Sequence, residues 1–389
     1  MNPIASLYQC RLAVVDLDAG CAHAAPLCPD ILESGLGGGA LASALAPLYP
    51  NATFLTSGPL GGGYAPASGA MTVSIPHSDN RGFSHAVAPL GHGAWLRQSG
   101  FDALVICGRS ASPRVIRCTG GDCCLEDAPV GMADRATLRA HLLRQTEDGR
   151  AGLILADSGN ANLPVAGGAE YGSLPAGTLI GPALQARNIS GLCLEGGSPL
   201  PLGQLPLDNA LRQAVARHTP DNALANFFTE AQCDAALVAG FKLKGAACFH
   251  CPSPCLCWIE TSESTHLLLA DHGAFAAALD ACGSNAPACL AACDAVGVDP
   301  RVAAPLVKNS GAEEFSRILA SLACTDDSPP QPASELSEAE RIASILGICP
   351  RLVRRTPGLS REVLEAALGS EASTLLARSE AALGQEVFV

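Results

Sequence analysis

Four cysteines lie within ten residues of one another, between Cys248 and Cys257. Three of them have the spacing C-x2-C-x3-C: Cys248, Cys251 and Cys255. This spacing lets one short loop place three thiolates around a cuboidal iron–sulfur cluster, and the two prolines inside the loop keep it from forming a helix. A [4Fe–4S] cluster at this loop needs a fourth thiolate from another part of the chain.

Three other uses of these cysteines compete with a cluster. A structural zinc site would take the same three cysteines and add Cys257, Cys349 or His250. Disulfides are disfavoured because residues 1–13 contain no charged segment followed by an apolar one, so we predict no export signal. Buried free thiols explain most of the 18 cysteines of the chain, but not four so close together. We therefore favour the [4Fe–4S] cluster.

The composition indicates an acidic, folded and soluble protein. The 389 residues are 48% apolar and 16% charged, which is enough to build the cores of two or three domains. The net charge of −13 argues against a nucleic-acid partner, because such a partner needs Lys and Arg opposite its phosphates. No apolar stretch reaches the roughly 18–20 residues that span a bilayer, so we expect no membrane insertion and a cytoplasmic location.

The pattern of apolar residues changes near Pro206 and predicts an α+β fold. Before this point, short apolar runs that end at turn residues predict strands over 11–17, 53–55, 71–75, 103–108, 114–118, 152–156 and 190–194. After it, a period of about 3.6 residues predicts an all-helical, shortened C-terminal half, with helices over 207–217, 222–238, 272–281, 286–296, 312–322, 338–346 and 361–383. We expect three domains: a β-rich domain 1–205, a helical domain 206–300 with the cysteine loop, and a shortened helical domain 301–389.

Two local patterns add detail to these domains. Residues 35–55 run through glycines, an Ala/Leu helix, Asn51 and a strand, and residues 172–194 repeat this order around Asn188. The repeat indicates a duplicated β/α unit in the β-rich domain. In the helical half, Ser337 with a glutamate three residues later predicts a capping box at the start of a helix.

Six further motifs follow one another along the chain: Gly37–Gly39, Thr56–Gly62, Gly100–Gly108, Arg187–Leu192, Asp294–Asp299 and Ser344–Cys349. With the cysteine loop, this ordered set resembles the aldehyde:ferredoxin oxidoreductases. That family has an early glycine-rich turn and then the motifs T-G-P-L-T-G, G-Y-D-A-I-I-I-x-G, K-N-L-K-A-I, D-x-x-G-L-D and D-x-x-G-L-C. Its members hold a tungsten or molybdenum bis-pterin beside a [4Fe–4S] cluster.

The resemblance implies roles for individual residues. It makes Cys349 the fourth cluster ligand, beside Cys248, Cys251 and Cys255. It implies that the bis-pterin contacts glycines and polar residues: Gly58, Gly61, Gly62, Asn188, Asp294, Gly297, Asp299 and Ser344. Glycines let backbone N–H groups approach a pterin or phosphate closely, and an aspartate at a helix end accepts hydrogen bonds from pterin amines.

The chain departs from the family at several positions. Ala70 stands where the family has the arginine of Ser-Gly-Arg, the family's asparagine is missing from 86–90, and Ser344 replaces an aspartate. The stretch between Asp299 and Ser344 is much shorter than in the family, where it carries the catalytic histidine. Because a bis-pterin is strongly anionic, losing cations and hydrogen-bond partners should weaken its binding, whereas all four cluster cysteines are kept.

These features predict one of two functions. The first is an enzyme that oxidises an aldehyde or related carbonyl at a tungsten or molybdenum pterin. Its electrons would pass through the cluster to ferredoxin or to an iron–sulfur or flavin partner subunit. The second is a non-catalytic electron-relay or scaffold subunit of a larger redox complex that has lost the pterin site. In both cases we expect an oligomer or a complex subunit, because a shortened helical half exposes surface that a partner covers.

Overall fold

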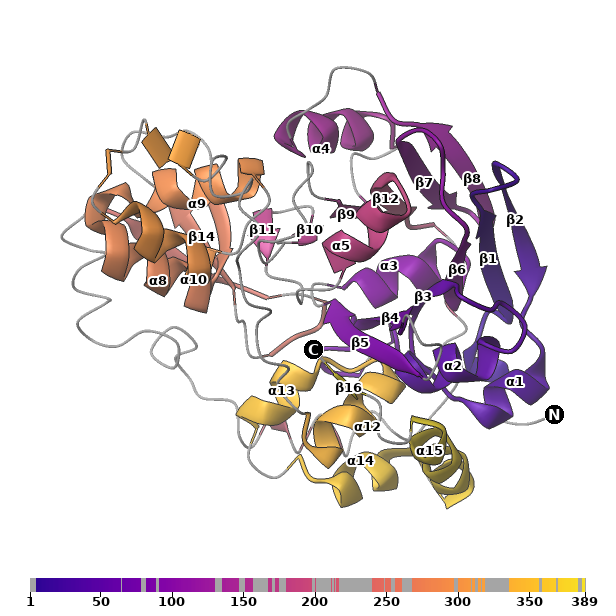
Figure 1. Cartoon of the computed structure of the whole chain (residues 1–389). Helices are drawn as coiled ribbons and strands as arrows, with labels where there is room; N and C mark the ends of the chain where they lie inside the picture. Colours follow the sequence, from indigo (N-terminus) through magenta and orange to yellow (C-terminus); the bar gives the residue numbers. More distant parts are fainter. Residues whose placement is uncertain are drawn as a thin grey trace.

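A computed structural model gives the fold of the chain. It describes residues 5–63, 65–77, 82–88, 91–129, 135–146, 151–156, 167–169, 172–174, 180–197, 200, 211, 213, 215–216, 240–247, 249–252, 256–260, 268–296, 300–308, 310–311, 314–315, 317–318, 336–356, 359–368, 370–383 and 387–388. The fold is α+β, as the sequence predicts, with a β-rich N-terminal part followed by a mainly helical part (Figure 1).

The N-terminal part is built on a mixed seven-stranded sheet in the order β16-β5-β4-β3-β6-β1-β2. Its strands are β1 Arg11–Asp16, β2 Cys21–Pro26, β3 Thr53–Thr56, β4 Met71–Pro76, β5 Phe83–Ala88, β6 Ala103–Cys107 and β16 Val387–Phe388. The pairs β1–β6 and β5–β16 are parallel, and the remaining pairs are antiparallel. A strand from the C-terminal end thus extends a sheet that the N-terminal residues begin.

A second, four-stranded sheet in the order β8-β7-β12-β9 packs against the first. Its strands are β7 Arg114–Thr119, β8 Asp122–Asp127, β9 Gly152–Leu155 and β12 Ile189–Glu195. Around it lie η1 Ala5–Leu7, α3 His92–Gln98, α4 Arg135–Arg144, α5 Ile180–Ala186, and the small hairpin of β10 Gly167–Ala169 and β11 Gly172–Leu174. Buried side chains of β1, β6, β7, β12 and α3 form one apolar core between the two sheets.

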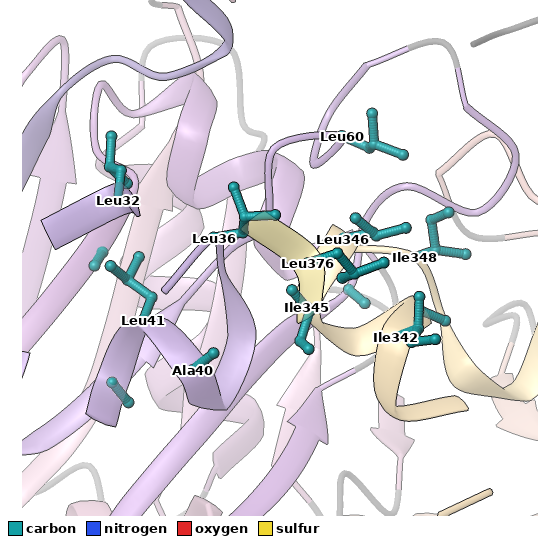
Figure 2. Packing of buried hydrophobic residues seen from close by; sticks show 14 of the residues in the cluster. Leu32, Leu36, Ala40, Leu41, Leu60, Ile342, Ile345, Leu346, Ile348 and Leu376 are labelled. Carbon is teal, nitrogen blue, oxygen red and sulfur yellow. The ribbon is translucent and has the colours of Figure 1, made fainter. Parts of the chain in front are cut away.

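The other face of the seven-stranded sheet is covered by helices from both ends of the chain (Figure 1). These are α1 Pro29–Ser34, α2 Gly38–Leu45, α12 Glu338–Leu346, α13 Pro350–Arg355, α14 Arg361–Leu368 and α15 Ser370–Leu383. Figure 2 shows Leu36 and Leu41 packed with Ile345 and Leu376 in this core. The predicted capping box at Ser337 is confirmed at the start of α12.

A third core lies in the middle of the chain and corrects one expectation. Residues after 206 are not all helical, because β13 Lys242–Ala246, β14 Leu256–Glu260 and β15 Leu268–Asp271 form an antiparallel sheet. Strands this short, interrupted by the cysteine loop, show too little alternation to be recognised beside Ala/Leu-rich helices. Packed with them are α8 His272–Cys282, η3 Gly283–Asn285, α9 Ala286–Val296, α10 Pro300–Ala303 and η4 Ala304–Val307. The helices predicted over 207–217, 222–238 and 312–322 lie wholly or mainly outside the described residues.

The internal repeat has a local counterpart in the structure. α2 is followed by Asn51 with φ 61° and then β3, and α5 is followed by Asn188 with φ 62° and then β12. Asparagine tolerates this left-handed backbone better than most residues. The two strands pair differently, because β3 has only antiparallel partners and β12 runs parallel to β7. None of the described helices has the length and apolar character needed to cross a bilayer.

Candidate metal centre

The predicted cysteine loop connects two paired strands. β13 and β14 are antiparallel, and their register ends with Ala246 opposite Leu256, so residues 247–255 form the connection. The pairing brings the two ends of this connection together, which suits a site that takes three ligands from one short segment. Cys251 is half-buried and packs against the apolar core that α2 and α12 share.

The residues beside Cys251 pack on the glycine-rich loop that follows β3. His250 has a left-handed backbone with φ 48°, and its ring Nδ1 lies 3.1 Å from the carbonyl oxygen of Gly63. The ring of Phe249 stacks on that of His250, with the centroids 4.3 Å apart. A Cβ atom on Gly69 would come within 3.0 Å of Phe249 Cβ, so glycine allows this close approach. The cysteine loop is therefore docked on the N-terminal part of the molecule.

The fourth predicted ligand reaches the same place from the C-terminal helices. Cys349 lies immediately before α13 and is 6% exposed, and its amide donates a hydrogen bond to the carbonyl oxygen of Ala67 at 3.0 Å. The amide of Ala67 donates in turn to the carbonyl oxygen of His250 at 3.1 Å. The structure therefore ties the segments of Cys251 and Cys349 to the main chain of a single residue.

The glycine-rich loop interlocks with the turn between α12 and α13. Gly347 ends α12 with φ 81°. The amide of Leu60 donates to the Leu346 carbonyl at 3.0 Å, and the amide of Ala70 donates to the Gly347 carbonyl at 3.1 Å. A Cβ atom on Gly58 would lie closer than 3.0 Å to backbone atoms of this turn. Figure 2 shows Leu60 and Leu346 on the facing segments. Glycine is needed at position 58 because the chain itself occupies the space.

Hydrogen bonds within the protein use the amides of Gly61 and Gly62, two of the three loop glycines to which the family resemblance assigns cofactor binding. Three consecutive amides donate to carbonyls of their own loop: Gly61 to Gly58, Gly62 to Ser68, and Gly63 to Leu60. The hydroxyl of Ser344 donates to the Arg341 carbonyl at 2.7 Å, inside α12. Ser57 Oγ is buried beneath the loop and has no hydrogen-bond partner among the described residues. The described loop thus offers an anionic cofactor few free donors.

A buried arginine that the sequence motifs do not single out supports the loop from below. Arg97, in α3, donates from its guanidinium to the carbonyls of Pro59 at 3.0 Å and Gly61 at 2.7 Å. Its Nε lies 3.4 Å from a carboxylate oxygen of Asp102. Burial raises the pKa of Asp102, although Arg97 and backbone amides act to lower it. The sequence contains a signal for this pair, because Arg97 and Asp102 each stand in an otherwise apolar segment. A charge that is buried in such a segment needs a partner of opposite charge or hydrogen-bond acceptors or donors.

Two other predicted cofactor contacts lie away from the glycine-rich loop. The side-chain amide of Asn188 donates to the Ser110 carbonyl at 3.1 Å, beside the second sheet. Its neighbour Arg187 donates to Thr53 Oγ1 at 2.8 Å, at the start of β3, whereas the glycine-rich loop follows the end of that strand. Asp294 belongs to α9, in the third core region. The described structure does not bring Asn188 to the glycines.

Comparison with known proteins identifies the N-terminal part of the chain. Residues 12–196 match the family model of the N-terminal domain of aldehyde ferredoxin oxidoreductase. The match covers a little under half of the chain, and this part is similar to that domain. The family resemblance expected from the motifs is thereby confirmed. None of the curated proteins matches the chain.

A likeness in fold to a solved structure extends beyond this domain. A solved structure of the active site complex BamBC of benzoyl coenzyme A reductase, in complex with 1,5-dienoyl-CoA, matches with a TM-score of 0.66 and 13% identity. The match covers 95% of this chain and 64% of the other, so this chain spans less than two thirds of that one. At this identity the likeness establishes the shared fold.

The two cofactors of the family fit the described residues unequally. No group of three or more metal-binding side chains occurs in the described part of the chain, which contains only two of the four predicted cluster ligands, Cys251 and Cys349. The segments of these two cysteines are both hydrogen-bonded to the main chain of Ala67. A bis-pterin fits poorly, because the glycine-rich loop is filled by the chain and its amides are bonded internally. Outside the described residues lie Cys248, Cys255, Gly297 and Asp299.

Proposed function

We propose that this chain holds one [4Fe–4S] cluster and relays electrons within a larger redox complex, without binding a bis-pterin. The cluster ligands in this proposal are Cys248, Cys251, Cys255 and Cys349. The observation that carries it is the pair of hydrogen bonds from the Ala67 main chain to the segments of Cys251 and Cys349. The segments of two cysteines far apart in the sequence are thereby bonded to one residue, and Cys248 and Cys255 flank Cys251 in the sequence of its loop.

The protein contributes position and surroundings to such a cluster. Cys349 is almost wholly buried, and Cys251 is half-buried on the same apolar core. Thiolates in such a place are shielded from water on one side and open on the other, which suits transfer of one electron to a docked protein. The cluster supplies the one-electron chemistry. Ferredoxin, or an iron–sulfur or flavin subunit of the same complex, is the partner that this role needs.

The loss of the pterin follows from charge and from space. A bis-pterin with its phosphates needs cations and free amides, and Ala70 stands at the position of the family's arginine. The guanidinium of Arg97 contacts the loop, but it is buried and already donates to Pro59 and Gly61. The space beside Gly58, which would admit the cofactor, is instead taken by the turn at Gly347. Oxidation of an aldehyde at this chain is therefore not part of the proposed function.

Metal analysis after anaerobic purification tests the proposal directly. We expect roughly four iron atoms per chain, with tungsten, molybdenum and zinc each far below one. The same iron with near-stoichiometric tungsten or molybdenum would favour the aldehyde-oxidising enzyme instead. Zinc without iron would refute both functions and would indicate a structural zinc site.

A further inference from the structure

We propose that the main chain of Ala67 is the positioning element that sets how Cys251 and Cys349 face the cluster. The inference rests on the proposed function and deepens it. It assigns a role at the cluster to the N-terminal domain, which supplies none of the four predicted ligands.

The two hydrogen bonds of Ala67 act directly on the peptide groups that carry the ligands. The His250 carbonyl belongs to the peptide that joins His250 to Cys251, and it accepts from the Ala67 amide at 3.1 Å. The Cys349 amide belongs to the peptide that ends at the Cys349 Cα, and it donates to the Ala67 carbonyl at 3.0 Å. Because a peptide group is planar and rigid, fixing its oxygen or its N–H also fixes the adjoining Cα. One residue thus orients two ligand Cα atoms.

The backbone of Ala67 is unusual in a way that serves this role. Its φ is 53°, a left-handed conformation that an alanine rarely adopts, and its bonding partner His250 is also left-handed with φ 48°. Two strained residues that bond to each other persist only where their surroundings hold them in place. Here Ser68 Oγ donates to the Gly63 carbonyl at 2.8 Å, and His250 Nδ1 lies 3.1 Å from the same oxygen.

The side chain of residue 67 explains why alanine is found there and not glycine. Glycine adopts a left-handed backbone more readily, but the methyl group of Ala67 is 1% exposed and belongs to the core shared by α2 and α12. The methyl group therefore anchors the loop in the core while its two polar main-chain groups face the cysteine segments. Ala67 therefore joins three segments of the chain: its own loop, the cysteine loop at His250 and the segment of Cys349 before α13.

Substitution by proline tests the inference, because proline has no N–H and holds φ near −65°. We expect Ala67→Pro in the full chain to lose at least half of its iron and to shift the midpoint potential and electron paramagnetic resonance spectrum of what remains. Ala67→Gly loses the methyl group but keeps the left-handed backbone and both hydrogen bonds, so we expect it to retain more iron than Ala67→Pro, with a potential and spectrum closer to those of the wild type. Asn51→Pro is the matched control, because Asn51 also has a left-handed backbone, with φ 61°. Asn51 lies before the start of β3, whereas the loop that contains Ala67 follows the end of that strand.

The outcomes separate this inference from the function on which it rests. Iron missing from the unmodified chain overturns the proposed function, and the inference with it. Roughly four iron atoms in the unmodified chain, with the same potential and spectrum in Ala67→Pro, overturns the inference alone. An equal loss of iron in Asn51→Pro also overturns it, because the effect would then be general destabilisation. If Ala67→Pro does not fold, Ala67→Val keeps the N–H but disfavours φ 53°. A folded Ala67→Val with unchanged potential overturns the inference, and a shifted potential supports it.

Discussion

Gly58→Ala tests the interpretation that the glycine-rich loop is packed against protein and not kept open for a cofactor. The new methyl group would lie closer than 3.0 Å to the Gly347 amide nitrogen and the Leu346 carbonyl carbon, which are backbone atoms that cannot rotate away. The loop and the turn after α12 would have to separate. Such overpacking costs about 1–3 kcal/mol.

The same separation also breaks the hydrogen bonds that join the two segments. The Leu60 amide and the Ala70 amide each donate to this turn, at 3.0 and 3.1 Å. Each bond contributes about 0.5–1.5 kcal/mol to the free energy of unfolding. We therefore expect Gly58→Ala to lower the free energy of unfolding by about 2–6 kcal/mol.

Urea denaturation of the metal-free chain, followed by circular dichroism, measures this loss. Gly311→Ala is the matched control, because no atom lies within 4 Å of the Cβ position at Gly311. We expect that variant to stay within about 0.5 kcal/mol of the wild type. If Gly58→Ala lowers the free energy of unfolding of the metal-free chain as little as Gly311→Ala does, the loop is not packed against the turn after α12. Gly58 would then serve another need, such as the approach of a cofactor.

Three other substitutions test the site and its surroundings. Cys349→Ser should bleach the broad visible absorbance of the cluster in anaerobic preparations, and an intact cluster would point to a different fourth ligand. Arg97→Met leaves the buried Asp102 carboxylate without its cation and should cost about 3–5 kcal/mol at neutral pH. The pKa of Asp102 is already raised in the folded state and rises further without Arg97. The loss of free energy of unfolding caused by Arg97→Met should therefore be smallest below the usual aspartate pKa of 3.8. It should grow as pH rises through the raised pKa of Asp102, and urea midpoints measured across pH test this trend. Cys118 and Cys123 are cross-strand partners with Sγ atoms 3.5 Å apart, so treatment with a thiol oxidant should join them in a disulfide detectable by peptide mass, and Cys123→Ser should prevent it.

Most of the strands that the sequence predicts lie inside the sheets, although the predicted β9 is an edge strand. β1, β6 and β7 match the predicted runs to within a residue or two, because each contains a mainly apolar run bounded by turn residues. β2 and β8, which lie at sheet edges, were not predicted, and neither was β5, which lies between β16 and β4. Most side chains of β2 are exposed, and β8 alternates between buried and exposed residues that include three acids. An edge strand needs a partner for only one side of its backbone, and its side chains need not be apolar.

Part of the candidate site can be predicted from neighbouring residues in the sequence, and part depends on contacts between segments far apart in the sequence. The spacing of the cysteine loop is a local property, so the sequence predicts three ligands from it directly. Ala67 and Arg97 act through main-chain carbonyls and amides of segments far away in the sequence. Neither residue type suggests such a role, since any residue has the same main-chain groups and an arginine in a helix is usually on the surface.

The glycine-rich motif shows why a matching motif alone does not establish a bound cofactor. A glycine at position 58 is required by two different needs, close approach of a pterin and close approach of another part of the chain. The described structure contains the second, because the turn at Gly347 occupies the space beside Gly58. This packing also places Cys349, two residues beyond Gly347, beside Ala67. A chain that had lost the pterin would still need the glycine to hold its cluster ligand. Under the proposed function, the cluster alone gives the motif a reason to be kept, so metal analysis, and not the motif, tests whether a pterin is bound.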